Sequence, residues 1–401
     1  MNASRRAWAL AVLATFSIAC GGDASKTPPG ASAEHAASAS AKESAAASAK
    51  PSAEASAPPS GAASAAPSAE ASAAPSAAPS ASPSGTASAA AKSEPSTFAA
   101  AIAPEAPSGV MRPGAADKLL KPGGDPIVKL LDAGEEPRSK LAYALEKGSA
   151  QDLDIAQETT AGMQVGVEKM PPTKAPRMSM RLKLDVRDKN EAGEAEVLAK
   201  LVKVSLETQG PADEAAAKQM KPLIDAMTGI SWSYWMSSHG RVRDMKMEDA
   251  RYKDAGTELL GLLTQSFESM AVLLPEEPVG LGAKWQVVTR VQSMGADILQ
   301  LETFTLKKRE ATRASLDVSL TQIAASDSVH PPNMQPGAAA KVVAFKSSAN
   351  GHTEFAAKRV GPNDASLRSR TLLEMSVKEA KGAAQNLRLE TSLTVHYGNA
   401  K

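Results

Sequence analysis

The sequence predicts an α+β fold: a curved antiparallel β-sheet with two amphipathic helices, preceded by a signal peptide and a long disordered linker. An apolar segment ends at Cys20, a stretch rich in Ala, Ser and Pro follows, and the C-terminal part alternates polar and apolar residues. We therefore expect residues 1–19 to be a signal peptide, residues 20–124 a linker, and residues 125–401 one folded domain.

The N-terminus has the three parts of an export signal. The basic pair Arg5-Arg6 precedes an apolar stretch that ends in small residues before Cys20. This stretch is shorter than the roughly 20 apolar residues that cross a bilayer. The residues around the cysteine resemble the lipobox of bacterial lipoproteins, although Ser17 stands where leucine is usual. The resemblance implies cleavage before Cys20 and attachment of lipid to its thiol; the alternative is a secreted protein without this anchor.

The residue after the cysteine indicates in which membrane the lipid anchor is finally placed. Gly21 follows Cys20, so the acidic residue typical of inner-membrane retention is missing. The resemblance then implies an anchor in the outer membrane of a Gram-negative host, with the domain facing the periplasm. The membrane, reached through the N-terminal lipid, is thus the first expected partner.

Composition excludes two features. Cys20 is the only cysteine, so no disulfide forms within the chain. The formal net charge is +1, which gives no basic footprint for phosphate, and we expect no nucleic-acid partner.

The predicted linker has little to bury. From Ala24 to about Thr97 it consists almost wholly of Ala, Ser, Pro, Glu and Lys, and its prolines interrupt helices. We interpret it as a spacer between membrane and domain; a neutral low-complexity insertion is the alternative. Phe98–Gly124 is transitional, because its prolines limit regular structure.

Two strands and a hairpin open the predicted domain. Arg177–Arg187 alternates cleanly between an apolar and a polar face. Residues 194–208 continue in this style, but their apolar phase changes, which predicts a bulge near Leu201. Residues 230–236 and 241–247 are predicted to pair through the turn Ser238-His239-Gly240.

The C-terminal part is a succession of predicted strands bounded by Gly, Pro, Asn or charged clusters. They span residues 285–291, 297–306, 315–323, 342–347, 352–358, 367–377 and 387–397. Strands this numerous, with short connections, indicate an antiparallel sheet that is wet on one face.

Two amphipathic helices are predicted to cover the other face of the sheet. The first begins at Pro211 and ends at Gly229, a C-terminal cap, and Pro222 should kink or split it. The second spans about Ala255–Leu273 and ends before Pro275.

No catalytic constellation stands out. The five histidines, His35, His239, His330, His352 and His396, form no HExxH pair or short cluster, and we expect them to be exposed. GxSxG and P-loop motifs are missing from the sequence. We therefore expect a protein that is not an enzyme and has no cofactor or metal. A hydrolase that uses carboxylates from separate strands is the alternative.

Methionine is abundant where aromatic residues are scarce, and most of its copies fall on the predicted inner faces. Methionine either fills an aromatic-poor core or lines a deformable apolar cavity. The candidate cavity residues are Met178, Met180, Leu182, Met220, Met227, Phe267 and Met270.

One segment carries a family resemblance. It reads Leu274-Pro275-Glu276-Glu277-Pro278-Val279-Gly280-Leu281-Gly282-Ala283-Lys284-Trp285. This segment resembles the L-P-x-x-P-V-x-x-G-x-x-W motif of an uncharacterised family of bacterial lipoprotein domains, in which an acidic residue often stands at the position of Ala283. The resemblance covers about Arg138–Tyr397 and implies no activity. The residues themselves indicate a connector, because proline ends a helix and glycine permits close approach.

The order of elements is similar to the half-barrel of periplasmic lipoprotein carriers and lipid-binding lipoproteins. We therefore expect a lipid-anchored envelope protein with a non-catalytic binding domain for an apolar ligand, a lipid or an envelope protein. The alternatives are the envelope hydrolase and a structural component of an envelope assembly.

Overall fold

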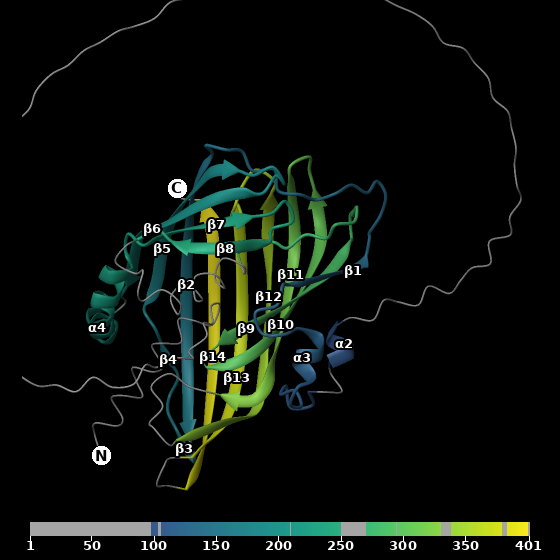
Figure 1. Cartoon of the computed structure of the whole chain (residues 1–401). Coiled ribbons are helices and arrows are strands. Elements are labelled where there is room, and N and C mark those ends of the chain that lie inside the picture. The colour runs from purple at the N-terminus through teal and green to yellow at the C-terminus, as the bar shows by residue number, and fades with distance from the viewer. Residues whose placement is uncertain are drawn as a thin grey trace, which may run out of the picture. The chain divides into compact units, whose positions relative to one another are not determined.

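The computed structural model describes residues 98–102, 106–208, 210–249, 270–293, 295–329, 338–378 and 383–399. Residues 1–97, with the predicted signal peptide, Cys20 and most of the predicted linker, lie outside these ranges. The main feature of the described residues is one 14-stranded sheet whose strand pairs are antiparallel (Figure 1).

The strands are β1 (Ile127–Asp132), β2 (Ala150–Val165), β3 (Glu168–Lys169), β4 (Thr173–Lys174), β5 (Arg177–Lys189), β6 (Ala195–Glu207), β7 (Ser231–Met236), β8 (Val242–Met247), β9 (Lys284–Ser293), β10 (Ala296–Arg309), β11 (Arg313–Val329), β12 (Ala339–Ala356), β13 (Asp364–Lys378) and β14 (Ala384–Asn399). The helices are α2 (Phe98–Ile102), α3 (Ala115–Leu119) and α4 (Pro211–Met227). None of the helices in the described part of the chain is long and apolar enough to span a membrane.

The sheet is open. Its strand order is β1-β9-β10-β11-β12-β13-β14-β2-β5-β6-β7-β8, and the short strands β3 and β4 pair with β2. Among the described strands, β1 and β8 end this path without pairing to each other. The C-terminal strand β14 lies between β13 and β2, so the two halves of the sequence join there.

The two ends of the sheet share one core. We call the inner face the one that carries Trp285 on β9 and Phe304 on β10. These side chains belong to the same buried cluster as Val197 on β6 and Trp232 on β7, near the other end of the strand order. In Figure 1, β5 to β8 run across one end of the long strands, which brings the two ends together.

The fold is mostly β, so the α+β class predicted from the sequence is wrong in its helical component. The helix α4 forms where it was predicted and continues through Pro222, and Gly229 follows it with a φ of 89°. It lies against β6, and only its C-terminal half carries residues that pack on the core, Ile224 and Met227. Its N-terminal half is rich in Ala and charged residues, which leaves it little to bury.

The second predicted helix, Ala255–Leu273, falls mostly on residues 250–269, which lie outside the described ranges. Its last four residues are described and are not helical. Met270–Leu274 instead forms an irregular, fully buried segment of the main core, which we call the roof segment.

Several strand predictions are confirmed. The bulge near Leu201 is present, because Arg181 pairs with Lys203 and the next residue, Leu182, pairs with Leu201. The hairpin of β7 and β8 also forms, and Gly240 in its turn has a φ of 85°.

The prediction of two separate strands, 342–347 and 352–358, is wrong, because β12 runs through Asn350-Gly351 as one strand. A Cβ atom at Gly351 would lie 1.9 Å from the main-chain oxygen of Ser366 on β13. Glycine here permits two strands to approach closely and does not end the strand.

The segment before residue 125 packs on the outer face of the sheet. Met111, Ala116 and Leu120 form a buried cluster with Leu299 and Leu301 of β10. Much of the predicted transitional segment is therefore ordered against the sheet, whereas the domain boundary at residue 125 stays a prediction.

Part of this segment fills a split in the sheet. Between Gln322↔Ser347 and Ser328↔Lys341 no residues of β11 and β12 are paired. Ser108–Met111 lies in the gap: the amide of Ala324 donates to Gly109 O at 2.9 Å, and the amide of Phe345 donates to Ser108 O at 3.0 Å. The segment completes the hydrogen bonding of both strands there.

Candidate functional site

A row of polar side chains crosses the inner face between apolar clusters. One residue comes from each strand from β9 to β14, and neighbours in the row are direct register partners: Thr289, Gln300, Gln322, Ser347, Thr371 and Thr391. All of these except Gln300 are buried. We call this set the polar row.

The polar row leads to a carboxyl group. Ser347 Oγ donates to Gln322 Oε1 at 2.6 Å and lies 2.8 Å from Thr371 Oγ1. Gln322 Nε2 then donates to Gln300 Oε1, and Gln300 Nε2 donates to Glu302 Oε1, each at 2.9 Å. Because Ser347 gives its proton to Gln322, Thr371 acts as the donor to Ser347. The bonds all point one way and end on Glu302, an arrangement that strengthens each bond.

Burial changes the acidity of Glu302. Loss of water around the carboxyl raises its pKa to about 7, although the hydrogen bond from Gln300 acts in the opposite direction. At neutral pH the group is therefore close to half protonated. A carboxyl so placed can accept a hydrogen bond or pair with a cation, and in its neutral form it can also donate.

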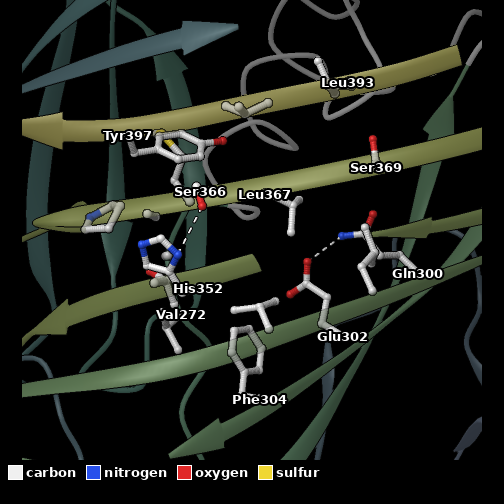
Figure 2. A pocket seen from close by; sticks show the side chains of 18 of the residues that line it. Val272, Gln300, Glu302, Phe304, His352, Ser366, Leu367, Ser369, Leu393 and Tyr397 are labelled. Atoms are coloured by element: carbon white, nitrogen blue, oxygen red, sulfur yellow. Dashed lines mark hydrogen bonds between the residues drawn. The ribbon is translucent and has the colours of Figure 1, made fainter. Parts of the chain in front are cut away.

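Glu302 projects into a cavity between the inner face and the roof segment (Figure 2). The cavity measures about 90 Å³. Its lining is mostly apolar and includes Met270, Val272, Phe304, Leu320, Leu393 and Val395. Polar residues, Glu302 among them, interrupt this apolar wall, and small-molecule binding sites also combine apolar walls with polar groups.

The roof segment is held by two buried side chains. Tyr143 Oη accepts the amide hydrogen of Val272 at 3.0 Å. Trp285 Nε1 donates to the main-chain oxygen of Leu273 at 2.8 Å. The indole also stacks on Phe304, with ring centroids 5.5 Å apart, and Phe304 lines the cavity. One tryptophan thus connects the roof to the cavity wall.

The motif Leu274–Trp285, which carries the family resemblance, supplies this tryptophan. A Cβ atom at Gly280 would lie 1.7 Å from the main-chain oxygen of Glu135, and Gly282 has a φ of 79°, so both positions favour glycine. The strand β9 begins at Lys284, just before Trp285. These features agree with the connector role inferred from the residues.

A second polar group lies close to the cavity, with its side chains on the outer face of the sheet. His352 Nε2 is 3.0 Å from Asp364 Oδ2, and His352 Nδ1 is 3.1 Å from Ser366 Oγ. The side chains of His352 and Asp364 are 47% and 63% exposed, so water weakens their pairing. Within the described residues, no cluster of three or more His, Cys, Asp or Glu side chains is arranged to hold a metal ion.

Of the candidate cavity residues from the sequence, Met270 lines this cavity. Met178 and Leu182 are buried in the main core, Met180 and Met227 pack partly buried against it, and Met220 is buried in α4. Phe267, like the lipid-attachment candidate Cys20, lies outside the described residues. In the described part of the chain, methionine thus serves mainly as core filling.

Sequence reasoning missed Glu302 and the polar row. In β10 the inner positions read Ile298, Gln300, Glu302, Phe304 and Leu306, so two polar residues interrupt an apolar face. Such polar residues in phase with apolar ones were the available signal. Until the pairing register of the strands is known, they cannot be distinguished from residues on the solvent-exposed face.

A larger hollow of about 980 Å³ lies on the outer face, between Ala106–Gly109 and Pro172. Charged residues Lys346, Arg370 and Glu390 line it.

No family model matches the chain, and no curated protein matches it at a significant level. A match among solved structures is the crystal structure of Pseudomonas aeruginosa OccK11 (OpdR), with 7% sequence identity and a TM-score of 0.19. The match covers 64% of this chain and 99% of that chain. A similarity this weak supports no conclusion about fold or function.

Proposed function

We propose that the chain is a lipid-anchored protein of the bacterial envelope whose domain binds a mainly apolar molecule without turnover. The observation that carries this proposal is the cavity beneath the roof segment, whose wall is mainly apolar and whose polar groups include the half-buried carboxyl of Glu302. The lipobox-like residues at Cys20 and the predicted spacer support an anchor at the outer membrane with the domain in the periplasm. The similarity in element order to half-barrel lipoprotein carriers agrees with this role.

The size of the cavity limits what it holds. Its volume of about 90 Å³ is well below the roughly 300–1,000 Å³ of pockets that hold drug-sized ligands. The cavity therefore takes one end of a long-chain molecule, and entry of more of the molecule requires the roof segment to move. Met270 at this edge suits such movement, because its unbranched side chain changes shape at low cost.

Extraction of the purified full chain with organic solvent, followed by mass spectrometry, tests the proposal directly. We expect a co-purified apolar molecule, or saturable binding of an added alkyl probe. Leu367→Phe should weaken binding, because Leu367 lines the cavity and has room on that side. Thr394→Phe, on the opposite face of the neighbouring strand, is the matched control. Failure of the chain to bind any alkyl probe contradicts the proposal.

The arrangement of Ser366, His352 and Asp364 favours a second candidate, hydrolysis of esters. A histidine between a hydroxyl and a carboxylate can remove the hydroxyl proton during attack. A p-nitrophenyl ester assay with wild type and Ser366→Ala separates the candidates: turnover that depends on Ser366 supports the hydrolase. A glycan hydrolase needs two carboxylates, and in the described lining Glu302 is the one carboxylate.

A further inference from the structure

The polar end of the ligand can be inferred from the charges around the cavity. We propose that the cavity selects a long-chain amine, with its ammonium group on Glu302 and its alkyl chain against the apolar wall. This inference rests on the proposed binding function and narrows its ligand class.

The carboxyl group of Glu302 can accept more hydrogen bonds than the described residues donate to it. An ionised carboxylate offers about four lone-pair sites, and among the described residues the side-chain amide of Gln300 donates one hydrogen bond to Glu302. The carboxyl group points toward the open middle of the cavity in Figure 2. Among the described residues, no donor reaches the carboxyl on the side where a ligand would lie.

The charge of the described cavity lining favours a cationic ligand over an anionic one. Neither lysine nor arginine lines the cavity among the residues that the structure describes. The other titratable residues at the cavity are Tyr397 and His352, and the ring of His352 lies on the outer face of the sheet, within hydrogen-bond distance of Asp364 and Ser366. A fatty acid would bring a second carboxylate beside the first, and one of the two would have to take up a proton.

The polar row supports the ionised form of the Glu302 carboxyl group. The row directs its donors toward Glu302 through Gln300, which stabilises negative charge on the carboxyl. An ammonium group on the other side completes a charge-assisted hydrogen bond, roughly twice as strong as a neutral one. Binding of the amine should therefore strengthen as pH rises from 5.5 to 8, since Glu302 has a pKa of about 7.

Isothermal titration calorimetry of the full chain with dodecylamine, dodecanol and dodecanoate tests the inference at low salt and pH 8. Wild type should bind the amine at least about tenfold more tightly than dodecanoate, the range of a hydrogen bond to a charged group. Glu302→Gln keeps the shape, removes the charge, and should abolish this preference while dodecanol binding changes little. Glu310→Gln, in the exposed turn after β10, is the matched control.

The possible outcomes distinguish selection of an amine from binding of an apolar molecule in general. Dodecanoate binding as tight as amine binding, or amine binding that survives Glu302→Gln unchanged, overturns the amine inference and leaves the binding function standing. Failure of all three probes to bind wild type overturns both. Circular dichroism of each variant confirms that the folded sheet is retained.

Discussion

The hydroxyl of Tyr143 accepts the amide hydrogen of Val272 at 3.0 Å, across 129 residues of sequence. Both residues are buried, so this bond fixes the middle of the roof segment over the sheet. Burial raises the pKa of the Tyr143 hydroxyl well above its usual value, so the group stays protonated at any physiological pH. The position of the roof therefore depends on this neutral hydrogen bond, on the indole of Trp285, and on the amide of Leu274, which donates to the main-chain oxygen of His239 at 3.0 Å.

Tyr143→Phe should loosen the roof. The ring keeps its edge-on contact with Phe355, at 4.9 Å between centroids, but the amide of Val272 loses its acceptor. An unsatisfied buried donor costs about 1–3 kcal/mol, so the midpoint of urea unfolding should fall accordingly. Probe dissociation should also be faster. Unchanged stability and unchanged dissociation would show that the roof does not depend on this bond.

Glu302→Gln should change how stability depends on pH. The pKa of Glu302 is about 7 in the folded protein and near 4.5 when unfolded, so the folded state holds the proton more tightly. Its contribution is complete below pH 4.5 and is lost as pH rises to 7, by up to about 3 kcal/mol. The variant should therefore be more stable than wild type at pH 8 and similar to it at pH 4.5. Urea unfolding at both values measures the difference, and an equal difference at both contradicts the prediction.

The strands of the sheet could be predicted from the sequence more fully than the residues of the candidate site. Clean alternation located β5 and β14, and a change of apolar phase located the bulge in β6. The central strand β2 was missed because Gln157 and Thr159 stand at inner positions, which hides its period. The same cause hid Glu302: a polar residue becomes recognisable as internal only when long-range pairing places it beside Gln300 and Gln322. Local pattern does not contain that information.

Arg290→Met should destabilise the outer face strongly. The guanidinium is 7% exposed and pairs with Asp297 at 2.6 Å, while it also contacts Asp117 and the main-chain oxygen of Leu120 near α3. Removal leaves the carboxylate of Asp297, itself 17% exposed, without its cation, which costs about 3–5 kcal/mol for a buried pair. Arg388→Met, at an exposed pair with Glu390, should cost less than about 1 kcal/mol. Urea unfolding compares the two variants, and equal losses would contradict the assignment.

Gly109→Ala should displace the segment that fills the split between β11 and β12. A Cβ atom there would lie 1.7 Å from the main-chain oxygen of Phe345. Gly114→Ala is the matched control, because Gly114 has nearly the same φ, 75° against 74°, and no atom within 4 Å of the added Cβ. Hydrogen exchange at the amides of Ala324 and Phe345 should speed up in the first variant alone. Equal exchange in both variants would mean that the clash is relieved without loss of the segment.

The polar row also bears on how the sheet finds its alignment during folding. A strand that slips by two residues keeps its apolar side inward, so hydrophobic burial alone discriminates poorly against that error. In this sheet, a slip of β11 would move Gln322 away from Gln300 and Ser347 and leave a buried amide without partners. Each buried polar group left without a partner costs about 1–3 kcal/mol, so the hydrogen-bonded residues from Gln300 to Thr371 mark the correct alignment of β10 to β13. Misaligned sheets would then be rejected early, before they could persist as long-lived misfolded species.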